Sequence, residues 1–275
     1  MLKTRVISGA VVFLIAATTC FIGGPVLLVT LAAISYIAYY ELCKAIGLHM
    51  ADSKPAFLEI IGYISVTVYY VLVFFELSER YFPVWVILTL LFLAAAYVFT
   101  FPKYKAQNFM GAFFCILYAP VMFSYIYLTR SMENGFLMVC LVFICSWMCD
   151  TCAYFVGMNF GRHKLAPVLS PKKSIEGAVG GVAGTVLACV IYDVVLTSLG
   201  YLTYRDIWMC MAIGTVGSIF SQIGDLCASG IKRNFGIKDY GSLIPGHGGI
   251  MDRFDSVIVT SPLIYFLAKI FISFR

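Results

Sequence analysis

Charged residues are scarce in this 275-residue chain, because Asp, Glu, Lys and Arg together make up only 12% of it. Soluble domains carry about 25% charged residues and about 45–50% apolar ones, whereas 61% of this chain is hydrophobic. So few charges cannot cover a water-exposed surface of this size. The composition therefore excludes an ordinary soluble domain and indicates that the bilayer is the solvent.

The chain also lacks a disulfide framework, although it contains ten cysteines. Most of them lie inside apolar runs, where a free cysteine behaves as a small hydrophobe, and disulfide staples belong to small secreted domains. The single C-x-x-C, from Cys149 to Cys152, lacks the soluble βαβ context of a redox motif. No clear A-x-A-like cleavage site follows the first apolar run, so we expect an uncleaved span there.

Apolar runs of the length that crosses a bilayer, about 20 residues, recur along the whole chain. The nine predicted spans are 6–21, 26–40, 57–75, 82–101, 108–129, 136–155, 177–199, 207–223 and 256–274. A short turn with Gly23 and Gly24 joins the first two, which predicts an antiparallel pair. The fold class is therefore an all-α polytopic membrane protein of about nine transmembrane helices with a cytoplasm-facing polar cavity, divided into N-terminal helices (1–135) and a catalytic region (136–275).

Lys and Arg residues support this count and give an orientation, because cytoplasmic loops are enriched in them. With the N-terminus inside and strict alternation, fourteen of the nineteen lie inside and five outside. The two segments richest in polar residues, 150–176 and 225–255, then face the cytoplasm, where nucleotides are available. We expect the chemistry there, in an integral membrane protein.

The segment from Asp225 to Asp255 holds eight charged residues and one histidine in 31 positions, where the average of 12% predicts about four charges. Asp252 and Asp255 stand three apart and share a face if helical. Carboxylates suit Mg²⁺, which commonly bridges to substrate phosphates, and cationic side chains bind phosphate oxygens. Acids, a Gly-rich turn and cations together predict phosphoryl or nucleotidyl transfer. The cations are Lys232, Arg233, Lys238 and Arg253, and the turn contains His247, Gly248 and Gly249.

Each of these residues also has a simpler interpretation when it is taken alone. Lys232 with Arg233 is more often a positive-inside anchor, Asp252 or Asp255 can be a favourable charge at a helix N-terminus, and His247 can be a turn residue. The functional hypothesis depends on their density.

A second polar cluster runs from Asp150 to Gly177. Asp150 lies inside the predicted sixth span, where a carboxylate is costly without a partner or metal. Ser174 and Glu176 precede a Gly-rich helix start whose N–H groups can receive phosphate. A basic loop that binds anionic headgroups is the simpler interpretation, and it leaves Asp150 and Glu176 unexplained. The small residues Gly177, Gly180, Gly181 and Gly184 predict close packing on a neighbouring helix.

The residues from Ser229 to Asp255 resemble a known signature at seventeen specified positions in 27. The pattern is Ser229-x-Ile231-Lys232-Arg233, Lys238-Asp239-x-Gly241, and Ile244-Pro245-x-His247-Gly248-Gly249-Ile250-x-Asp252-Arg253-Phe254-Asp255. It looks like that of the phosphatidate cytidylyltransferases, also called CDP-diacylglycerol synthases. Asp150-Thr151-x-Ala153-Tyr154 and Ser170-Pro171-Lys172-Lys173-Ser174-x-Glu176-Gly177 also look like that family.

The resemblance implies that CTP and phosphatidate react to give CDP-diacylglycerol and pyrophosphate. It implies metal-holding acids at Asp225, Asp252 and Asp255, which bind Mg²⁺ paired with a monovalent cation such as K⁺, in a homodimer that takes its substrate from membrane lipid. We expect no nucleic-acid partner. The expected catalytic residues are Asp225, Lys232, Arg233, Lys238, Asp239, His247, Asp252, Arg253 and Asp255, and the expected substrate-binding residues are Asp150, Tyr154, Lys172, Lys173, Ser174, Glu176, Ser229, Gly248 and Gly249.

Two other functions are weighed against this one. A CTP-dependent polyprenol or phytol kinase would share the acids and the nucleotide but would phosphorylate a lipid alcohol. A secondary transporter would use Asp150 and Asp225 as ion sites, yet the sequence shows no repeated half of the kind that transporters often have. The complete signature favours cytidylyl transfer.

Overall fold

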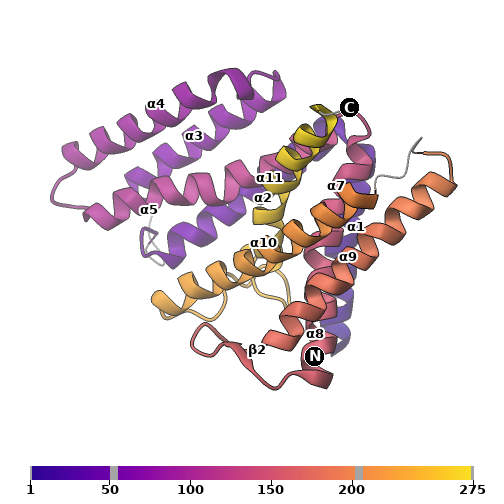
Figure 1. Cartoon of the computed structure of the whole chain (residues 1–275). Coiled ribbons are helices and arrows are strands. Elements are labelled where there is room, and N and C mark those ends of the chain that lie inside the picture. The colour runs from indigo at the N-terminus through magenta and orange to yellow at the C-terminus, as the bar shows by residue number, and fades with distance from the viewer. Residues whose placement is uncertain (1, 50–54, 202–206, 274–275) are drawn as a thin grey trace. The chain divides into compact units, whose positions relative to one another are not determined.

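The computed structural model describes residues 2–49, 55–201 and 207–273, and most of them are helical (Figure 1). Lys54, Arg205 and Arg275, which enter the predicted charge count, and Phe274 of the ninth span lie outside these residues. A helix occupies each of the nine predicted positions, which confirms the all-α class. The helices are α1 (Leu2–Ile22), α2 (Gly24–Ala45), α3 (Phe57–Phe74), α4 (Ser78–Phe99), α5 (Ala106–Ile116), α6 (Met122–Arg130), α7 (Gly135–Phe143), α8 (Cys149–Phe160), α9 (Ile175–Ser198), α10 (Ile207–Asn234) and α11 (Met251–Ser273).

Two of the predicted spans are composite rods that contain a π-helical turn. The turn η1 (Leu117–Val121) joins α5 to α6, and η2 (Ile144–Met148) joins α7 to α8. Pro120 lies within η1 and cannot donate a backbone hydrogen bond to the helical ladder. Such π turns interrupt an α-helix locally and are frequent at functional sites. The turn η2 lies directly before the helix that carries Asp150.

Seven rods are long and apolar enough to cross a membrane, which confirms an integral membrane protein. They are α2, α3, α4, the rods Ala106–Arg130 and Gly135–Phe160, α9 and α10. In α1 the segment Val6–Ile22 is a shorter apolar helix, and α11 is not among the seven when the described residues are searched. The count of nine crossings stays a prediction.

Three local features differ from the sequence-based expectation. The helix α10 continues to Asn234, eleven residues past the predicted end of its span, and α11 begins at Met251, before the predicted start at residue 256. The expected basic loop is a two-stranded antiparallel hairpin, β1 (Lys164–Ala166) and β2 (Ser170–Ser174), which pairs Lys164 with Ser174. Hydropathy identifies only the apolar part of a helix, so it does not predict the polar extensions of α10 and α11 or the short polar hairpin.

The chain forms two compact units. The first contains Met1–Ser131 and Asn234–Phe254, and the second contains Met132–Arg233 and Asp255–Arg275. The predicted regions 1–135 and 136–275 group residues by function, which this division by contacts does not test.

Within the first unit, buried polar contacts join helices that are distant in sequence. The hydroxyls of Ser35 and Tyr70 lie 2.6 Å apart, and Tyr70 also donates to the carbonyl of Pro120 in η1. Arg130 donates from Nε to the Cys20 carbonyl (2.8 Å) and from Nη2 to that of Phe21 (3.2 Å), so it caps the end of α1. Gly23, with φ of 69°, then turns the chain into α2, as the predicted helical pair requires.

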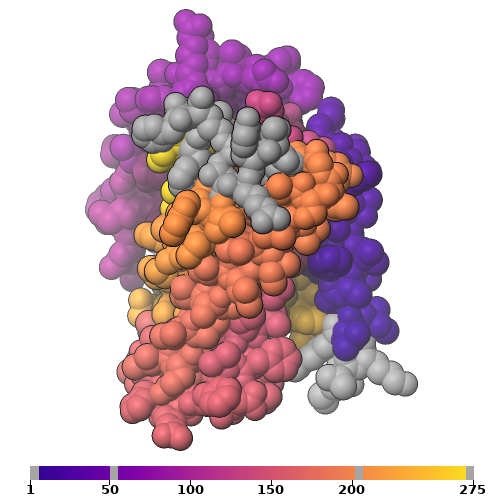
Figure 2. Space-filling view, turned by 45° about the vertical axis from the view of Figure 1, so that its right-hand side comes forward, coloured from indigo at the N-terminus to yellow at the C-terminus, as the bar shows by residue number. Residues whose placement is uncertain are grey.

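Within the second unit, α8 and α9 pack closely through glycines, as the sequence predicts. A Cβ added at Gly177 would lie 2.8 Å from the Ala153 carbonyl oxygen, and one at Gly184 would lie 2.5 Å from the sulfur of Cys152. Gly180 and Gly181 face Val156 and Cys149 in the same way. All ten cysteines are free thiols, which confirms their predicted unpaired state. Figure 2 shows the face that α8, the hairpin and α9 form, coloured pink to orange.

Candidate active site

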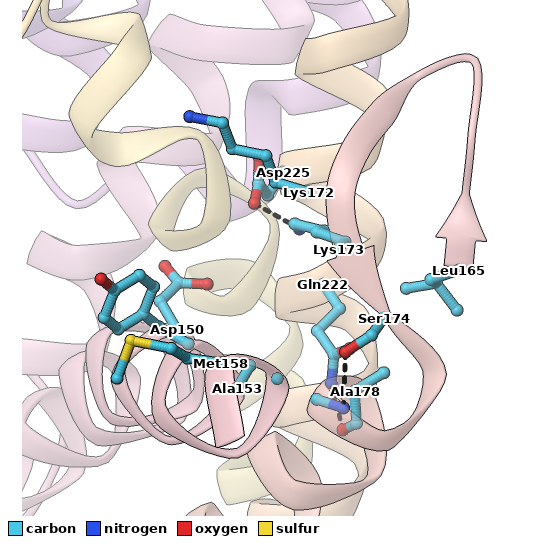
Figure 3. A pocket seen from close by; sticks show the side chains of 13 residues that line it. Asp150, Ala153, Met158, Leu165, Lys172, Lys173, Ser174, Ala178, Gln222 and Asp225 are labelled. Atoms are coloured by element: carbon cyan, nitrogen blue, oxygen red, sulfur yellow. Dashed lines mark hydrogen bonds and ion pairs between the residues drawn. The ribbon is translucent and has the colours of Figure 1, made fainter. Parts of the chain in front are cut away.

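A pocket of about 300 Å³ lies in the second unit, between α8, the β1–β2 hairpin, α9 and α10 (Figure 3). Six of the predicted site residues line it, namely Asp150, Tyr154, Lys172, Lys173, Ser174 and Asp225. The remaining lining residues are mostly small or apolar, and they include Met158 and Leu165. The structure therefore brings the second predicted cluster together with one acid of the first.

Asp225 on α10 forms an ion pair with Lys173 on β2 (Figure 3). Each of the two side chains is 25% exposed, so the pair lies at the pocket surface and remains accessible. The neighbouring Lys172 also lines the pocket and is more exposed. Two lysines beside two carboxylates can bind phosphate oxygens and a cation in the same small volume.

Asp150 projects into the pocket from the first turn of α8 (Figure 3). Its Oδ2 accepts a hydrogen bond from the Ser256 hydroxyl at 3.4 Å, and Ser146 in η2 donates to that same hydroxyl at 2.7 Å. Serines from η2 and α11 therefore orient this carboxylate. Asp150 lies in a rod, Gly135–Phe160, that is long and apolar enough to cross a membrane, and a carboxylate in such a rod marks a functional site by default.

Ser174 and Glu176 have different surroundings, although both belong to the predicted substrate-binding set. Ser174 is the N-cap of α9, and its hydroxyl accepts from the Gly177 N–H at 3.1 Å while it lines the pocket. Glu176 does not line the pocket. Its carboxylate accepts from the backbone N–H groups of Arg162 and His163 and lies 2.6 Å from His163 Nδ1. Glu176 thus holds the turn before the hairpin.

The last turns of α10 carry Ser229, Lys232 and Arg233. Arg233 Nε donates to the Leu169 carbonyl at 3.5 Å and so connects α10 to the tip of the hairpin. Asp255, only 9% exposed in the first turns of α11, is repelled by Asp225 and Asp150 and attracted by Lys232. The carboxylates of Asp150, Asp225 and Asp255 therefore lie close enough to influence one another electrostatically.

The rest of the signature lies in the first unit and forms a turn-rich loop before α11. Asp252 Oδ2 accepts from the Tyr240 N–H at 2.8 Å and the Gly249 N–H at 3.0 Å, and an isolated bridge pairs Ile244 with Gly248. His247 Nδ1 lies 2.8 Å from the hydroxyl of Ser8 on α1. Of the remaining predicted residues in this segment, Lys238, Asp239 and Arg253 are exposed.

Glu41 on α2 organises this loop, although no sequence pattern predicts it. Its Oε1 accepts from the Ile250 N–H at 3.1 Å and its Oε2 from the Met251 N–H at 2.9 Å, at the start of α11. The carboxylate lies where a Cβ of Gly241 or Gly249 would stand. These two signature glycines are needed because only hydrogen leaves room for Glu41. The one available signal is an acid directly after the predicted second span, and at that position a charged residue does not stand out.

Gln222 is a second residue that the sequence does not predict. It lines the pocket from α10, and its Nε2 donates to the carbonyl of Ala178 on α9 at 3.1 Å (Figure 3). This contact joins the two helices at the edge of the pocket.

The carboxylates fit a magnesium ion that is shared with a phosphate-bearing substrate. Among the described residues, no group of three His, Cys, Asp or Glu side chains can hold a metal ion by itself. Mg²⁺ in phosphoryl-transfer sites usually takes one or two carboxylates and completes its shell with water and substrate phosphates. Asp225 and Asp255, with Asp150 beside them, provide such an incomplete set.

Comparisons with known proteins identify the family of the chain. Residues 3–271 match the model of the family described as the Cytidylyltransferase family. A phosphatidate cytidylyltransferase of Staphylococcus aureus is 32% identical over 277 residues, which cover 97% of this chain and 98% of that protein. Phosphatidate cytidylyltransferases of Staphylococcus epidermidis and Staphylococcus haemolyticus are 41% and 42% identical over 58% of this chain, and these alignments span 60% of the relatives' length.

Proposed function

The chain belongs to the cytidylyltransferase family, and from this we propose that it transfers the cytidylyl group of CTP to phosphatidate, which gives CDP-diacylglycerol and pyrophosphate for phospholipid synthesis. The observation that carries the proposal is the pocket of the second unit, where Lys172, Lys173, Asp150 and Asp225 converge. The phosphatidate cytidylyltransferase of S. aureus, similar along nearly the whole chain, supports the choice of substrates.

In the proposed reaction, a phosphate oxygen of phosphatidate attacks the α-phosphorus of CTP. A new P–O bond forms, the bond between the α-phosphorus and the bridging oxygen to the β-phosphorus breaks, and pyrophosphate leaves with the electron pair. The attacking phosphate is already ionised, so the step needs no dedicated general base. Catalysis then depends on positioning and on neutralising charge between two anionic substrates.

The basic side chains perform this neutralisation in the proposal. Lys173 offsets the charge of Asp225 in the described state and can turn to a phosphate oxygen when the nucleotide enters. Lys172 and Lys232 add positive charge from β2 and from the end of α10. The N–H groups at the start of α9, next to Ser174, offer a further place for a phosphate.

We propose Mg²⁺ as the cofactor, with a monovalent cation such as K⁺ beside it. In this proposal Asp225 and Asp255 of the second unit hold Mg²⁺, and the resemblance to the family supports a metal-binding role for Asp252 as well. A bound Mg²⁺ supplies charge stabilisation to the phosphoryl oxygens and to the leaving pyrophosphate. Because Asp252 Oδ2 already accepts two backbone N–H groups, its carboxylate is held in a fixed orientation.

We also propose that the pocket faces the cytoplasm of a bacterial cell membrane, and that the protein works as a homodimer. The excess of Lys and Arg in the predicted inside segments supports the orientation, and the staphylococcal relatives support a bacterial membrane. The resemblance to the family supports the dimer. Light scattering of the detergent-solubilised protein should give twice the mass of the 30.5 kDa chain, and a monomeric mass at full activity would contradict it.

The activity is tested by measuring the transfer of label from CTP to each of two lipid acceptors. Proteoliposomes receive CTP labelled at either the α- or the γ-phosphate, together with phosphatidate or dolichol. We expect α-label to enter lipid only with phosphatidate, with one pyrophosphate released per lipid product. Transfer of γ-label to dolichol would identify a lipid kinase instead.

A further inference from the structure

An apolar groove of about 270 Å³ lies in the second unit, on the surface between α9 and α10. Val179 and Val182 line it from α9, and Ile219, Ile223 and Leu226 line it from α10. The spacing places each set on one face of its helix. Gln222 is the one polar side chain in the lining.

The groove continues from the polar pocket, because Leu165, Ala178 and Gln222 line both. Gln222 stands at the boundary, where its hydrogen bond to Ala178 ties α9 to α10. On one side of this contact are Lys172, Lys173 and the two aspartates, and on the other side are aliphatic side chains alone. The cavity therefore has a charged end and an apolar end, like a phospholipid.

The apolar end is positioned to open toward lipid. Both helices that form it are long and apolar enough to span a membrane, and Val179, Ile219 and Ile223 are 64%, 42% and 48% exposed. Figure 2 shows the outer surface of α9 in the second unit, and this helix carries exposed apolar side chains such as Val179 and Leu187. An acyl chain can then enter from the side without leaving the hydrocarbon layer.

We propose that this groove binds an acyl chain of the lipid acceptor while the acceptor's phosphate lies in the polar pocket. The proposal rests on the proposed function and assigns a subsite within it. Lipid tails are as apolar as leucine side chains, so burial of the chain in the groove adds little hydrophobic free energy. The contribution of the groove is orientation, because it fixes where the phosphate of a long-chain lipid meets the nucleotide.

The test compares two phosphatidates, one with long acyl chains in vesicles and one with short chains that leave most of the groove unfilled. Val182→Trp and Ile219→Trp each fill the groove from one helix. We expect either variant to lower kcat/KM for the long-chain lipid by on the order of tenfold to a hundredfold, the scale of a misplaced reactant. Turnover of the short-chain lipid and KM for CTP should stay within about twofold.

Leu187→Trp is the matched control, because Leu187 is a 61% exposed residue of α9 that does not line the groove. Its activity with both lipids should equal that of the wild type. Equal losses with both lipids in the groove variants, or no loss with either, would overturn the acyl site. A wild-type protein that labels neither lipid would instead overturn the proposed function, and the acyl site with it.

A second measurement does not depend on the variants folding. Wild-type protein is irradiated with phosphatidate that carries a photoreactive group near the end of one acyl chain, and the modified peptides are mapped. Modification concentrated on the 179–182 and 219–226 segments, and reduced by excess unlabelled phosphatidate, would support the site. Modification spread evenly over lipid-facing helices, unaffected by competitor, would overturn it.

Discussion

Lys173 forms an ion pair with Asp225 in the polar pocket, and it is the residue whose charge the proposed mechanism uses most directly. In the structure, the ammonium group of Lys173 neutralises the carboxylate of Asp225. When a nucleotide triphosphate enters, the same ammonium group has a more highly charged partner within reach. Substrate binding is therefore expected to exchange one ion pair for another.

Lys173→Gln should raise KM for CTP by about tenfold, because it removes one charge-assisted contact, about 1.5–3 kcal/mol before solvent exposure weakens it. Lys164→Gln is the matched control, since Lys164 is an exposed lysine of the same hairpin outside the pocket. Steady-state kinetics with varied CTP measures both. An unchanged KM in the Lys173 variant would remove this lysine from nucleotide binding.

The sequence predicts several of the charged residues that line the pocket, but it does not predict the residues that support the pocket and the loop before α11. Asp150, Lys172 and Asp225 stand out because ionisable groups are costly near hydrocarbon. Gln222 and Glu41 do not stand out, because one is an uncharged residue of a helix and the other follows directly on the predicted second span. The roles of Gln222 and Glu41 depend on which helices pack together, and a single sequence does not show which helices are neighbours.

Glu41 is tested by a substitution that keeps its shape. Glu41→Gln replaces one acceptor oxygen by an NH₂ group and should leave the N–H of Ile250 or Met251 without its acceptor. The loss should lower the free energy of unfolding by about 1.5–3 kcal/mol and reduce activity through the displaced loop before α11. Thermal unfolding in detergent and labelled-CTP turnover measure the two effects.

Glu76→Gln controls for the change of charge, because Glu76 is an exposed residue of the same unit. It should be neutral in both assays. If Glu41→Gln were equally neutral, the loop before α11 would not depend on the α2 carboxylate.

At the scale of elements, the packing of α8 on α9 positions the pocket. Asp150 and Tyr154 come from one helix, and Ser174 caps the other. A Cβ added at Gly177 would lie only 3.1 Å from the Cα of Gly157, so the backbones of the two helices are nearly in contact. The run of small residues predicts this contact, whereas the β1–β2 hairpin beside it has no hydrophobic pattern to reveal it.

A pair of identical substitutions tests the close approach of the two helices. Gly177→Ala places a methyl group 2.8 Å from a backbone oxygen, which forces the helices apart and should cost about 1–3 kcal/mol of stability. Gly230→Ala meets only a Leu169 methyl at 3.5 Å and should be neutral or stabilising, by up to about 1 kcal/mol. Thermal unfolding in detergent measures the stability of both variants. Equal stability of the two variants would contradict the packing.

At the scale of the whole molecule, hydropathy predicts where along the chain the helical segments lie. It does not predict that residues 234–254 join the first unit while the acids and lysines of the pocket belong to the second. Hydropathy reports how each segment meets lipid, and segments with the same hydropathy can pack in many ways.

Orientation is testable with two introduced cysteines on opposite predicted sides of one rod. Val168→Cys lies at the exposed hairpin tip and should react with a membrane-impermeant maleimide only after cells are permeabilised. Glu133→Cys, exposed in the segment before α7, should react in intact cells. The unmodified chain sets the background, since its exposed Cys227 is already present. The reverse pattern would place the pocket outside the cell.

We propose that the polar pocket of the second unit binds the nucleotide for cytidylyl transfer. An experimental structure with a non-hydrolysable CTP analogue and Mg²⁺ tests it most directly. We expect a triphosphate in contact with Lys172 and Lys173, with the metal between phosphate oxygens and Asp225. A nucleotide bound away from these residues, with the Lys173–Asp225 pair intact and the pocket filled by lipid or water, would contradict it.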